Sequence, residues 1–435
     1  MNQIIQSLRE DAVAAFHAAV AAVQPAGLLA DTVTVDGDRV TIRGETLPRV
    51  SGRRVVTSLG KAAPGLADAW IERAPGWADE IFVLAPHDVP VTDRVRAAAE
   101  VHSAGHPYPD ASGESATTRL IDLARSLGET DLLIVLLSGG SSALLAAPVE
   151  GVTREDVATT TRALMEAGAT INQVNTVRRQ LLAATGGGLA QAASPARVVT
   201  LVLSDVPGDP LADIGSGPTV RSPTTAADAL GVLGGLALVA DLPRAVIDVL
   251  RSRVDTPSDE SWEDRSRVQI LANNRTAVHA AASMLTEHGY ATLVHPGYLE
   301  GEASTRGTLM AQLATAFWSR RRVAFLVGGE TTVTVRGNGR GGRNHELALA
   351  AAMGLDGPSK TAILSAGTDG IDGRAEGAGA VVDATTVARL RNAGIDPMEA
   401  LANNDAGTAL AAVGDSIVTG PTGTNVCDVT MVLTG

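Results

Sequence analysis

Lysine, cysteine and aromatic residues are scarce in this sequence. Aromatic residues make up 3% of the 435 positions, and Cys427 is the single cysteine. One cysteine excludes an intramolecular disulfide and a cysteine-rich zinc site. No uncharged apolar run reaches the roughly 18 residues that a membrane span needs. We therefore expect neither a disulfide scaffold nor a membrane-spanning protein.

Positive charge is also in deficit. The 35 Lys and Arg residues stand against 48 Asp and Glu residues, a net charge of −13 with a pI of ≈ 5.1. This balance argues against a nucleic-acid partner. Residues 2–23 carry acids and bases throughout, which predicts an amphipathic helix and not a signal peptide. We expect a cytoplasmic protein that acts on a small molecule, with no membrane partner; a polyanionic substrate would need a locally positive cleft.

Short β-branched runs alternate with alanine-rich helical stretches along the chain. Most of these runs are apolar at every position, which indicates strands covered by helices on both faces of a largely parallel sheet. The sequence therefore predicts an α/β fold. The expected strands are 54–59, 80–85, 132–137, 198–203, 268–272, 291–295, 323–327, 331–335, 361–365 and 427–433.

The weakest patterning lies between residues 231 and 267, where the sequence is polar, acidic and turn-prone. We place a domain boundary near residue 240. The expected domains are 1–240 and 241–435.

Glycine stands beside hydroxyl or acidic residues after nearly every expected strand. In open α/β sheets, ligands bind beyond the carboxyl ends of the strands. One such loop is ordinary turn chemistry, but six on one chain are better explained by a shared cleft for an anionic ligand. The six loops are "SLGKAAPG", "LLSGGSSALLAAP", "LSDVPGDPLADIGSGPT", "VGGETT", "LSAGTDGIDG" and "VTGPTGTNVCD".

The loop Ser138–Ser142 joins an apolar strand to a helix-compatible stretch. Gly139 and Gly140 permit a tight turn, while Ser141 and Ser142 can cap a helix whose N-terminal amides would hold a phosphate or carboxylate. A plain strand-to-helix turn is the alternative. The loop matches neither the Walker A pattern nor the G-x-S-x-G nucleophile elbow.

A formal G-x-G-x-x-G occurs at Gly337, Gly339 and Gly342, which makes a dinucleotide site a rival interpretation. The acid that would hold the ribose, Asp356, precedes the next expected strand instead of ending it. Arg343 and a second arginine three positions earlier add positive charge at the helix start, and arginine matches phosphate oxygens in a planar fork. A triphosphate or a phosphoryl group in transfer would use this charge.

Acidic residues follow several strands. Acids near bound phosphates commonly hold Mg²⁺, and one can accept the proton of an attacking hydroxyl. Asp and Gly are also common turn formers, so each acid has a structural alternative. These acids are Asp205, Asp209, Asp213, Glu330, Asp369 and Asp372. The histidines show no zinc-type spacing, and only His106 is a candidate to line the cleft.

Taken together, the loops resemble those of the glycerate 2-kinase family, whose C-terminal part is called the MOFRL domain; some members carry an older label as hydroxypyruvate reductases. The matching segments run in family order from about residue 50 to 430. They include "SLGKAAPGLA", "HSAGHPYPDASG", "LLSGGSSALLAAPVEGVT", "INQVNTVRRQL", "LSDVPGDPLADIGSGPT", "GGETTVTVRGNGRGGRNHELALA", "SAGTDGIDG" and "TGPTGTNVCD".

The resemblance implies transfer of the γ-phosphoryl group of ATP, with Mg²⁺, to the 2-hydroxyl of D-glycerate. It also implies a larger Rossmann-like N-terminal domain and a smaller α/β C-terminal domain with MOFRL at about 320–430, and an active site in the cleft between them. Carried over by motif, the catalytic residues are Lys61, Asp205 and Arg343.

The remaining roles follow the same motifs. Nucleotide and phosphate contacts fall on Ser138, Gly139, Gly140, Ser141, Ser142, Gly341, Gly342, Asn344, Thr368 and Asp369. Asn175 and Arg178 suit the substrate carboxylate, and Asp205, Asp209 and Glu330 are metal-ligand candidates. Asp205 has three possible roles, because the sequence does not separate orienting the hydroxyl, accepting its proton and binding Mg²⁺.

Lys61 is one of two lysines among 35 basic residues, the other being Lys360. A compact ammonium on a flexible stem can follow a moving phosphoryl group as a point charge, whereas arginine imposes a plane. We therefore expect lysine at this position to be functional.

Two departures from the family pattern concern the substrate side. Thr185 stands where the family tends to have lysine, and Ser222 stands where aspartate is usual. A kinase for a longer sugar acid is therefore one alternative. A nicotinamide-dependent hydroxypyruvate reductase and a non-catalytic binding protein are the others. A homodimer is possible.

Overall fold

The computed structural model describes the chain except residues 1, 38, 48, 255–260, 317–321 and 356–358. Its contacts divide the chain into two compact units. The N-terminal unit is Leu28–Leu271, and the C-terminal unit is Ala272–Gly435 together with Met1–Gly27. The division falls at residue 271 instead of near 240, and the first 27 residues belong to the C-terminal unit.

Residues between 240 and 271 belong to the N-terminal unit because they complete its core and its sheet. Helix α11 (Arg244–Val254) buries Val246 and Leu250 in a helical cluster with α7, α8 and α10. Strand β9 (Ser266–Ala272) is then the last strand of the sheet. Of the polar stretch that suggested a linker, residues 255–260 lie outside the described part of the chain.

The N-terminal unit is built on a six-stranded sheet in the order β6-β5-β4-β7-β8-β9. Its strands are β4 (Arg54–Leu59), β5 (Glu80–Pro86), β6 (Glu100–Ala104), β7 (Leu132–Ser138), β8 (Arg197–Leu203) and β9. The pairings from β6 through β8 are all parallel. The prediction of a largely parallel sheet is confirmed for this unit, although β6 was not predicted. A small separate sheet contains β1 (Val33–Asp36), β2 (Arg39–Ile42) and β3 (Glu45–Thr46).

Helices cover both faces of the six-stranded sheet, as the apolar strands predicted. One face packs Leu59 and Leu137 against α5 and α9. The other face packs Val83 against α3 and α4. The helices of this unit are α2 (Pro25–Thr32, whose first three residues belong to the C-terminal unit), α3 (Ala63–Arg73), α4 (Asp93–Ala98), α5 (Ala111–Arg125), α6 (Ser141–Leu144), α7 (Arg154–Glu166), α8 (Ile171–Leu181), α9 (Gly188–Ala193), α10 (Ala226–Gly235), α11, η1 (Ile214–Ser216) and η2 (Glu263–Arg265).

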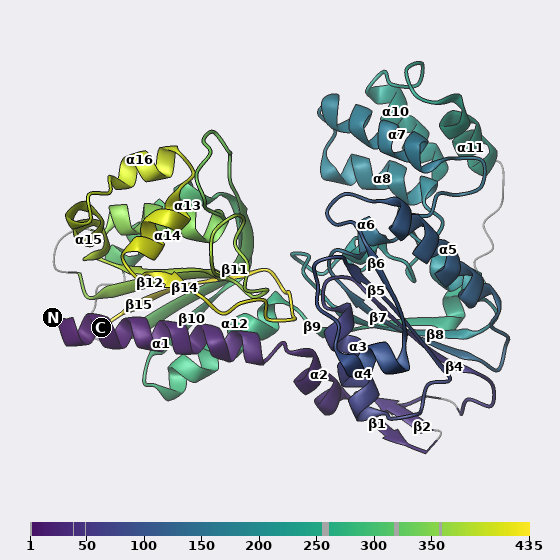
Figure 1. The fold of residues 1–435 in the computed structure, drawn as a ribbon, viewed down its shortest axis with the longest axis horizontal. Coiled ribbons are helices and arrows are strands. Elements are labelled where there is room, and N and C mark those ends of the chain that lie inside the picture. Colours follow the sequence, from purple (N-terminus) through teal and green to yellow (C-terminus); the bar gives the residue numbers. More distant parts are fainter. Residues whose placement is uncertain (1, 38, 48, 255–260, 317–321, 356–358) are drawn as a thin grey trace. The chain divides into compact units, whose positions relative to one another are not determined.

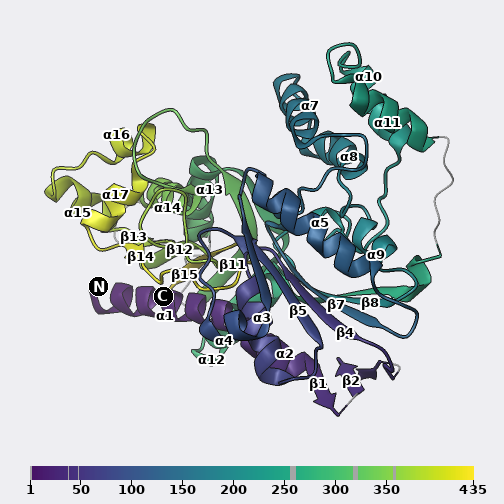
Figure 2. The same ribbon diagram turned by 45° about the vertical axis from the view of Figure 1, so that its right-hand side comes forward.

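The strand order has a functional consequence. Counted along the chain from β4, it reads 3-2-1-4-5-6, the order of the doubly wound nucleotide-binding fold. The order reverses between β4 and β7, which are adjacent and parallel; Figure 2 shows these two strands within the sheet. Ligands bind outside the carboxyl ends of the strands at such a switch point. The loops after β4 and β7 are therefore the expected location of a ligand-binding site.

The C-terminal unit contains a second six-stranded sheet, in the order β10-β11-β15-β12-β13-β14. Strands β10 and β11 are parallel, and the other pairings are antiparallel. The strands are β10 (Ala291–Glu302), β11 (Val323–Thr332), β12 (Thr361–Gly367), β13 (Gly379–Asp383), β14 (Ser416–Ile417) and β15 (Asp428–Thr434). The prediction of two strands at 323–327 and 331–335 was wrong, because Gly328 and Gly329 pair within the sheet and continue one strand.

Helices lie on both faces of this sheet as well. Helices α13 and α14 bury their apolar side chains with β11, β12 and β13, and α1 and α12 contact each other and the sheet. The helices are α1 (Asn2–Ala21), α12 (Asn274–Glu287), α13 (Ala303–Ala316), α14 (Arg343–Gly354), α15 (Thr386–Asn392), α16 (Pro397–Ala402) and α17 (Ala406–Ala412). Figure 1 shows α1 lying along this sheet, with both chain termini in the C-terminal unit.

Ion pairs fix α1 to the C-terminal unit. Arg9 donates to Asp383 at 2.7 Å and to Asp415 at 2.6 Å, and both acids are buried. Arg389 bonds Asp415 through both terminal nitrogens at 2.8 Å. Burial raises the pKa of Asp383, but hydrogen bonds from Thr385 and Arg9 outweigh it and hold that pKa below its ordinary value. The first helix is thus a structural part of a unit that is otherwise far away in sequence.

Replacing Arg9 with alanine should lower the free energy of unfolding by about 2–3 kcal/mol, because two buried carboxylates lose a charge partner while Arg389 remains. The depressed pKa of Asp383 means that this contribution is present above the unfolded-state value of 3.8 and is lost as the pH falls through the folded-state value. Urea unfolding of Arg9→Ala at pH 7 and pH 3.5 measures both effects. The exposed Glu10→Ala on the same helix is the control; equal losses in the two variants would contradict the assignment.

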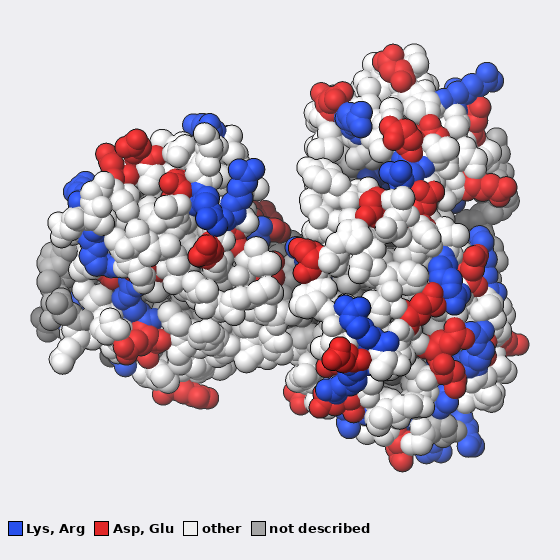
Figure 3. All heavy atoms as spheres, viewed as in Figure 1, with Lys and Arg blue, Asp and Glu red and all other residues white. Residues whose placement is uncertain are grey.

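No single helix in the described part of the chain is long and apolar enough to cross a membrane, and only the bent pair Gln3–Ala21 and Pro25–Thr32 meets the criteria of length and composition. Acidic and basic side chains are interspersed on the face shown in Figure 3.

Candidate active site

The switch point of the N-terminal sheet brings together residues from four loops. The Lys61 amide donates to the Gly139 carbonyl at 2.9 Å, which joins the loop after β4 to the loop after β7. Ser138 strengthens the junction, since its hydroxyl accepts from the Ala62 amide at 3.0 Å and donates to the Leu59 carbonyl at 3.1 Å. Ser138 is completely buried, so its side chain holds the loops in place and is not available to a ligand.

Asp205 and Lys61 both lie against the glycines of the loop after β7. A Cβ atom placed on Gly139 would stand 1.6 Å from Asp205 Oδ2, so this carboxylate occupies the space that any side chain at 139 would need. A Cβ on Gly140, which has φ of +82°, would stand 3.0 Å from Lys61 Cγ and 3.1 Å from His106 Nε2. Two of the predicted catalytic residues, Lys61 and Asp205, therefore share one glycine turn, and His106 joins them.

His106 lies beside a cation. Burial lowers the pKa of His106, and the positive charge of Lys61 lowers it further. A neutral imidazole at this position can accept or donate a hydrogen bond without adding positive charge. The interpretation of His106 as a residue of this cluster is supported by its contact with Gly140.

The two serines that follow have different environments. Ser141 is buried and its hydroxyl has no hydrogen-bond partner among the described residues. Ser142 shares a hydrogen bond with Ser216 at 2.9 Å. The helix that they begin, α6, has only four residues. The expected anion site at a helix N-terminus is therefore reduced to a short turn, in which the Ser141 hydroxyl is buried and has no hydrogen-bond partner among the described residues.

Arg178 reaches the same loop from helix α8. Its Nη2 donates to the Ser142 carbonyl at 3.1 Å, and burial lowers the pKa of its guanidinium. Asn175 lies three residues earlier on α8, and positions three apart share one face of a helix. Asp209 lies in the turn after β8 with φ of +55°.

The C-terminal unit holds the third predicted catalytic residue, Arg343, in a carboxylate pair. Arg343 donates to Asp428 through Nε at 2.6 Å and Nη2 at 2.9 Å, and to Glu330 through Nη1 at 2.6 Å. Burial alone would lower the pKa of Arg343, but its hydrogen bonds to Asp428 raise it above the ordinary value. Burial raises the pKa of Asp428 to about 6, against the effect of Arg343. Glu330, a predicted metal ligand, is here a partner of Arg343.

The side chains of Asn344 and Thr368, which we expected to contact phosphate, form hydrogen bonds with other parts of the C-terminal unit. Asn344 is 1% exposed, and its amide oxygen accepts from Ser365 at 2.7 Å. The Thr368 hydroxyl donates to the Cys427 carbonyl at 2.7 Å and accepts from the Val426 amide at 2.9 Å. The Asp369 carboxylate accepts from the Ile371 amide at 3.1 Å. These contacts order the loops around Arg343.

The start of helix α14 is occupied by an acid of the protein itself. Asp372 accepts the amides of Asn344 at 3.1 Å and His345 at 2.8 Å. The glycines before it are packed against protein, since a Cβ on Gly342 would stand 2.4 Å from Asp372 and one on Gly341 would stand 2.8 Å from the Asn404 carbonyl. The G-x-G-x-x-G segment therefore serves close loop packing, and Asp356, the acid of the rival interpretation, lies outside the described residues.

Sequence reasoning missed Asp428 and the role of Asp372. Asp428 ends the "TNVCD" segment, but its partner Arg343 is 85 residues away. No local pattern marks such a pair. Among the described residues no group of three or more His, Cys, Asp or Glu side chains is placed to hold a metal ion.

A largely parallel sheet in this strand order, with a lysine, glycine turns and an aspartate at its switch point, places the chain in the class of doubly wound α/β proteins. Comparisons with known proteins identify the family of this chain. One family model, described as "Domain of unknown function (DUF4147)", matches residues 11–251, and the MOFRL family model matches residues 323–428. The chain belongs to the glycerate kinase family, which confirms the resemblance found in the sequence.

Individual relatives cover nearly the whole chain. The D-glycerate 2-kinase of Thermotoga maritima is 38% identical over 395 residues, covering 88% of this chain and 91% of that protein. Human glycerate kinase is 35% identical, covering 97% and 92%. A protein of Agrobacterium vitis that is named a putative hydroxypyruvate reductase is 41% identical, covering 88% and 100%. The crystal structure of the Thermotoga glycerate kinase superposes with a TM-score of 0.86 at 35% identity, covering 99% and 100%.

Replacing Gly139 with alanine should reduce turnover on the order of tenfold, because the new methyl group displaces the Asp205 carboxylate and small misplacements of reacting groups are costly. The backbone at Gly139 does not have positive φ, so strain from the turn itself is not expected. The control is Gly231→Ala, where a Cβ meets nothing within 4 Å. Steady-state kinetics and thermal melts of both variants test this; unchanged kcat in Gly139→Ala would contradict it.

Proposed function

We propose that this enzyme transfers the γ-phosphoryl group of ATP to the 2-hydroxyl of D-glycerate and releases ADP and 2-phosphoglycerate. The observation that carries the proposal is the cluster of Lys61, Gly139, Gly140 and Asp205 at the switch point of the sheet, in a chain whose relatives include named glycerate kinases. Phosphoryl transfer needs positioning and charge neutralisation from a protein more than covalent chemistry. The cluster offers both.

In the proposed reaction the 2-hydroxyl oxygen forms a bond to the γ-phosphorus, and the bond between that phosphorus and the β,γ-bridging oxygen breaks. Asp205 accepts the hydroxyl proton, because its carboxylate lies beside the glycine turn that would hold the phosphate. Lys61 neutralises the charge on the phosphoryl oxygens. Arg343 supplies a second positive charge, and Arg178 and Asn175 hold the substrate carboxylate.

The acids of the SDVPGD segment fit a magnesium ion. Mg²⁺ usually keeps several waters and binds through one or two carboxylates together with the substrate phosphates. Asp209 would supply an oxygen ligand of the preferred kind, while Asp205 in the same loop accepts the proton, so a cluster of three protein ligands is not required. The ion would neutralise charge on the nucleotide phosphates. A cytoplasmic location and a homodimer stay predictions.

An assay of ADP release separates this proposal from the reductase alternative. With D-glycerate and ATP we expect magnesium-dependent ADP release and a product that is 2-phosphoglycerate. With hydroxypyruvate and NADH, in the absence of ATP, we expect no NADH oxidation. The opposite pattern would overturn the proposal. A screen of three- to six-carbon hydroxy acids in the same assay identifies the preferred acceptor, and a longer acid with the highest kcat/KM would replace D-glycerate in the proposal.

A further inference from the structure

The N-terminal unit contains a cavity of about 910 Å³ that the residues of the Lys61 cluster do not line. Its walls come from α8, the turn into α9, the loop before α10, the end of α11 and the segment around η2. The residues that line it include Arg179, Thr185, Ser222, Arg253 and Trp262. Lys61, Gly139, Gly140 and Asp205 are not among the lining residues. The volume is within the range of small-molecule sites, which is about 300–1,000 Å³.

A buried arginine in this wall has unused hydrogen-bonding capacity. Arg179 is only 6% exposed, and its Nη2 is paired with Asp213. Its Nε is buried and has no hydrogen-bond partner among the described residues. Leaving a buried guanidinium nitrogen without a hydrogen-bond partner is energetically unfavourable. An anion in the cavity would remove that penalty.

Further positive charge surrounds the cavity. Arg253 donates to the neutral carbonyl of Gln180, and in the described part of the chain no carboxylate lies within 4 Å of it. Glu263 faces Arg221 at 3.4 Å, which balances that acid. Glu150 is exposed at the edge. Among the described residues, no carboxylate balances the Arg253 guanidinium, which is a positive charge in the wall of the cavity.

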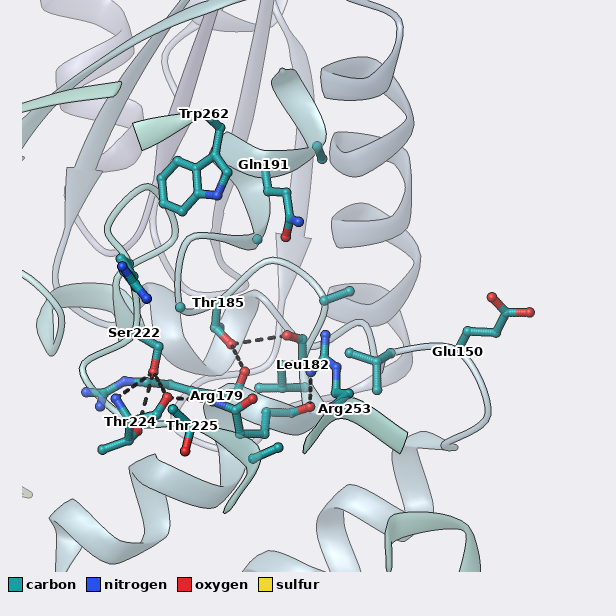
Figure 4. Close-up of a pocket in the computed structure, with 18 of the residues that line it drawn as sticks. Glu150, Arg179, Leu182, Thr185, Gln191, Ser222, Thr224, Thr225, Arg253 and Trp262 are labelled. Carbon is teal, nitrogen blue, oxygen red and sulfur yellow. Dashed lines mark hydrogen bonds between the residues drawn. The ribbon is translucent and has the colours of Figure 1, made fainter. Parts of the chain in front are cut away.

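The hydroxyl groups of the wall have already used their protons. Thr185 donates to the Leu182 carbonyl at 3.2 Å, Ser222 donates to the Thr224 carbonyl at 2.7 Å, and Thr225 donates to Asp228 at 2.8 Å. Figure 4 shows Thr185, Ser222, Thr224 and Thr225 grouped on one side, with Trp262 on the other. These oxygens can still accept hydrogen bonds. A ligand that matches the wall must therefore bring hydroxyl donors as well as negative charge.

We propose that this cavity is a second ligand site, which binds a small polyhydroxylated anion such as a sugar acid or a sugar phosphate. The anionic group contacts Arg179 and Arg253, the ligand hydroxyls donate to Thr185 and Ser222, and the Trp262 ring covers the apolar C–H face of the ligand. The site is separate from the Lys61 cluster, and the proposal does not depend on phosphoryl transfer.

Binding is measured without ATP, by titrating the protein with D-gluconate or D-glucose 6-phosphate and following tryptophan fluorescence and heat release. A carboxylate ligand and a phosphate ligand are thereby distinguished. We expect saturable binding of at least one probe, with a fluorescence change that is absent in Trp262→Phe. In Arg253→Gln the dissociation constant should rise about tenfold, because the ligand loses a hydrogen bond to a charged group. The exposed Arg251→Gln on the same helix should leave it unchanged.

Two further variants make the test decisive. Arg179→Lys keeps a positive charge beside Asp213 but removes the free Nε, so the fold is kept while binding weakens. Lys61→Ala should bind the probes as the unaltered protein does. The proposal is overturned if neither probe binds at millimolar concentration, if Arg253→Gln and Arg179→Lys both bind normally, or if Lys61→Ala abolishes binding, which would place the anion at the active site.

Discussion

Replacing Lys61 with alanine is expected to lower kcat by about 10²- to 10³-fold with a small change in stability. The reason is the position of the Lys61 side chain, whose Cγ lies beside Gly140 on the loop that would hold the transferred phosphate. Removing one preorganised charge partner of a transition state typically has an effect of this size. Lys61 is partly exposed at a strand end, so its removal opens no large cavity in the core. ADP release under saturating ATP and glycerate is the measurement.

The chain supplies a matched control, because Lys360 is its other lysine. Lys360→Ala should leave kcat unchanged, since that residue contributes a backbone carbonyl to Gly435 in the C-terminal unit. Lys61→Arg should also be impaired, because a planar guanidinium is a poor substitute for a point charge that follows a moving phosphate. Wild-type turnover in Lys61→Ala would remove this residue from the catalytic set, and full activity in Lys61→Arg would refute the explanation of why lysine is kept.

The local parts of the site could be predicted from sequence. An apolar strand followed by a glycine turn places Lys61 and the Ser138–Ser142 loop at strand ends, and a parallel sheet gathers such ends at one edge. The sequence also contained the SDV segment whose aspartate lies against Gly139. The positions of these residues at the strand ends could be predicted because each depends on neighbours in the chain and on one rule of sheet topology, whereas their roles stay predictions.

Features that depend on distant partners were not predictable. Strand β6 was missed because Glu100–Ala104 is a polar edge strand with little burial. The sequence of helix α1 did not indicate that it packs with β12 and β15, because its ion pairs join Arg9 to acids more than 370 positions away. The hydrogen bonds that Asn344 and Thr368 make within the protein were not predicted for the same reason, and their contact with phosphate stays a prediction. A polar residue in a glycine-rich loop suits a ligand and a buried hydrogen-bond network equally well.

Replacing Arg343 with alanine is expected to lower kcat by about 10²-fold or more and also to destabilise the C-terminal unit. The activity loss follows from the proposed role of its positive charge on the phosphoryl oxygens. The stability loss follows from Asp428, which is 4% exposed and would be left as a buried, unpaired carboxylate. Breaking a buried ion pair in this way lowers the free energy of unfolding by about 3–5 kcal/mol. Kinetics and urea unfolding measure the two losses separately.

A second substitution separates catalysis from folding. In Arg343→Ala/Asp428→Asn the buried charge is gone, so most of the stability should return while kcat remains low. Arg340→Ala is the matched control, because that arginine stands in the same loop and its side chain is 63% exposed. If the double variant regains both stability and turnover, Arg343 acts only as a structural partner of Asp428. If it regains stability alone, the guanidinium acts in the reaction, and the carboxylates around it serve to hold it in place.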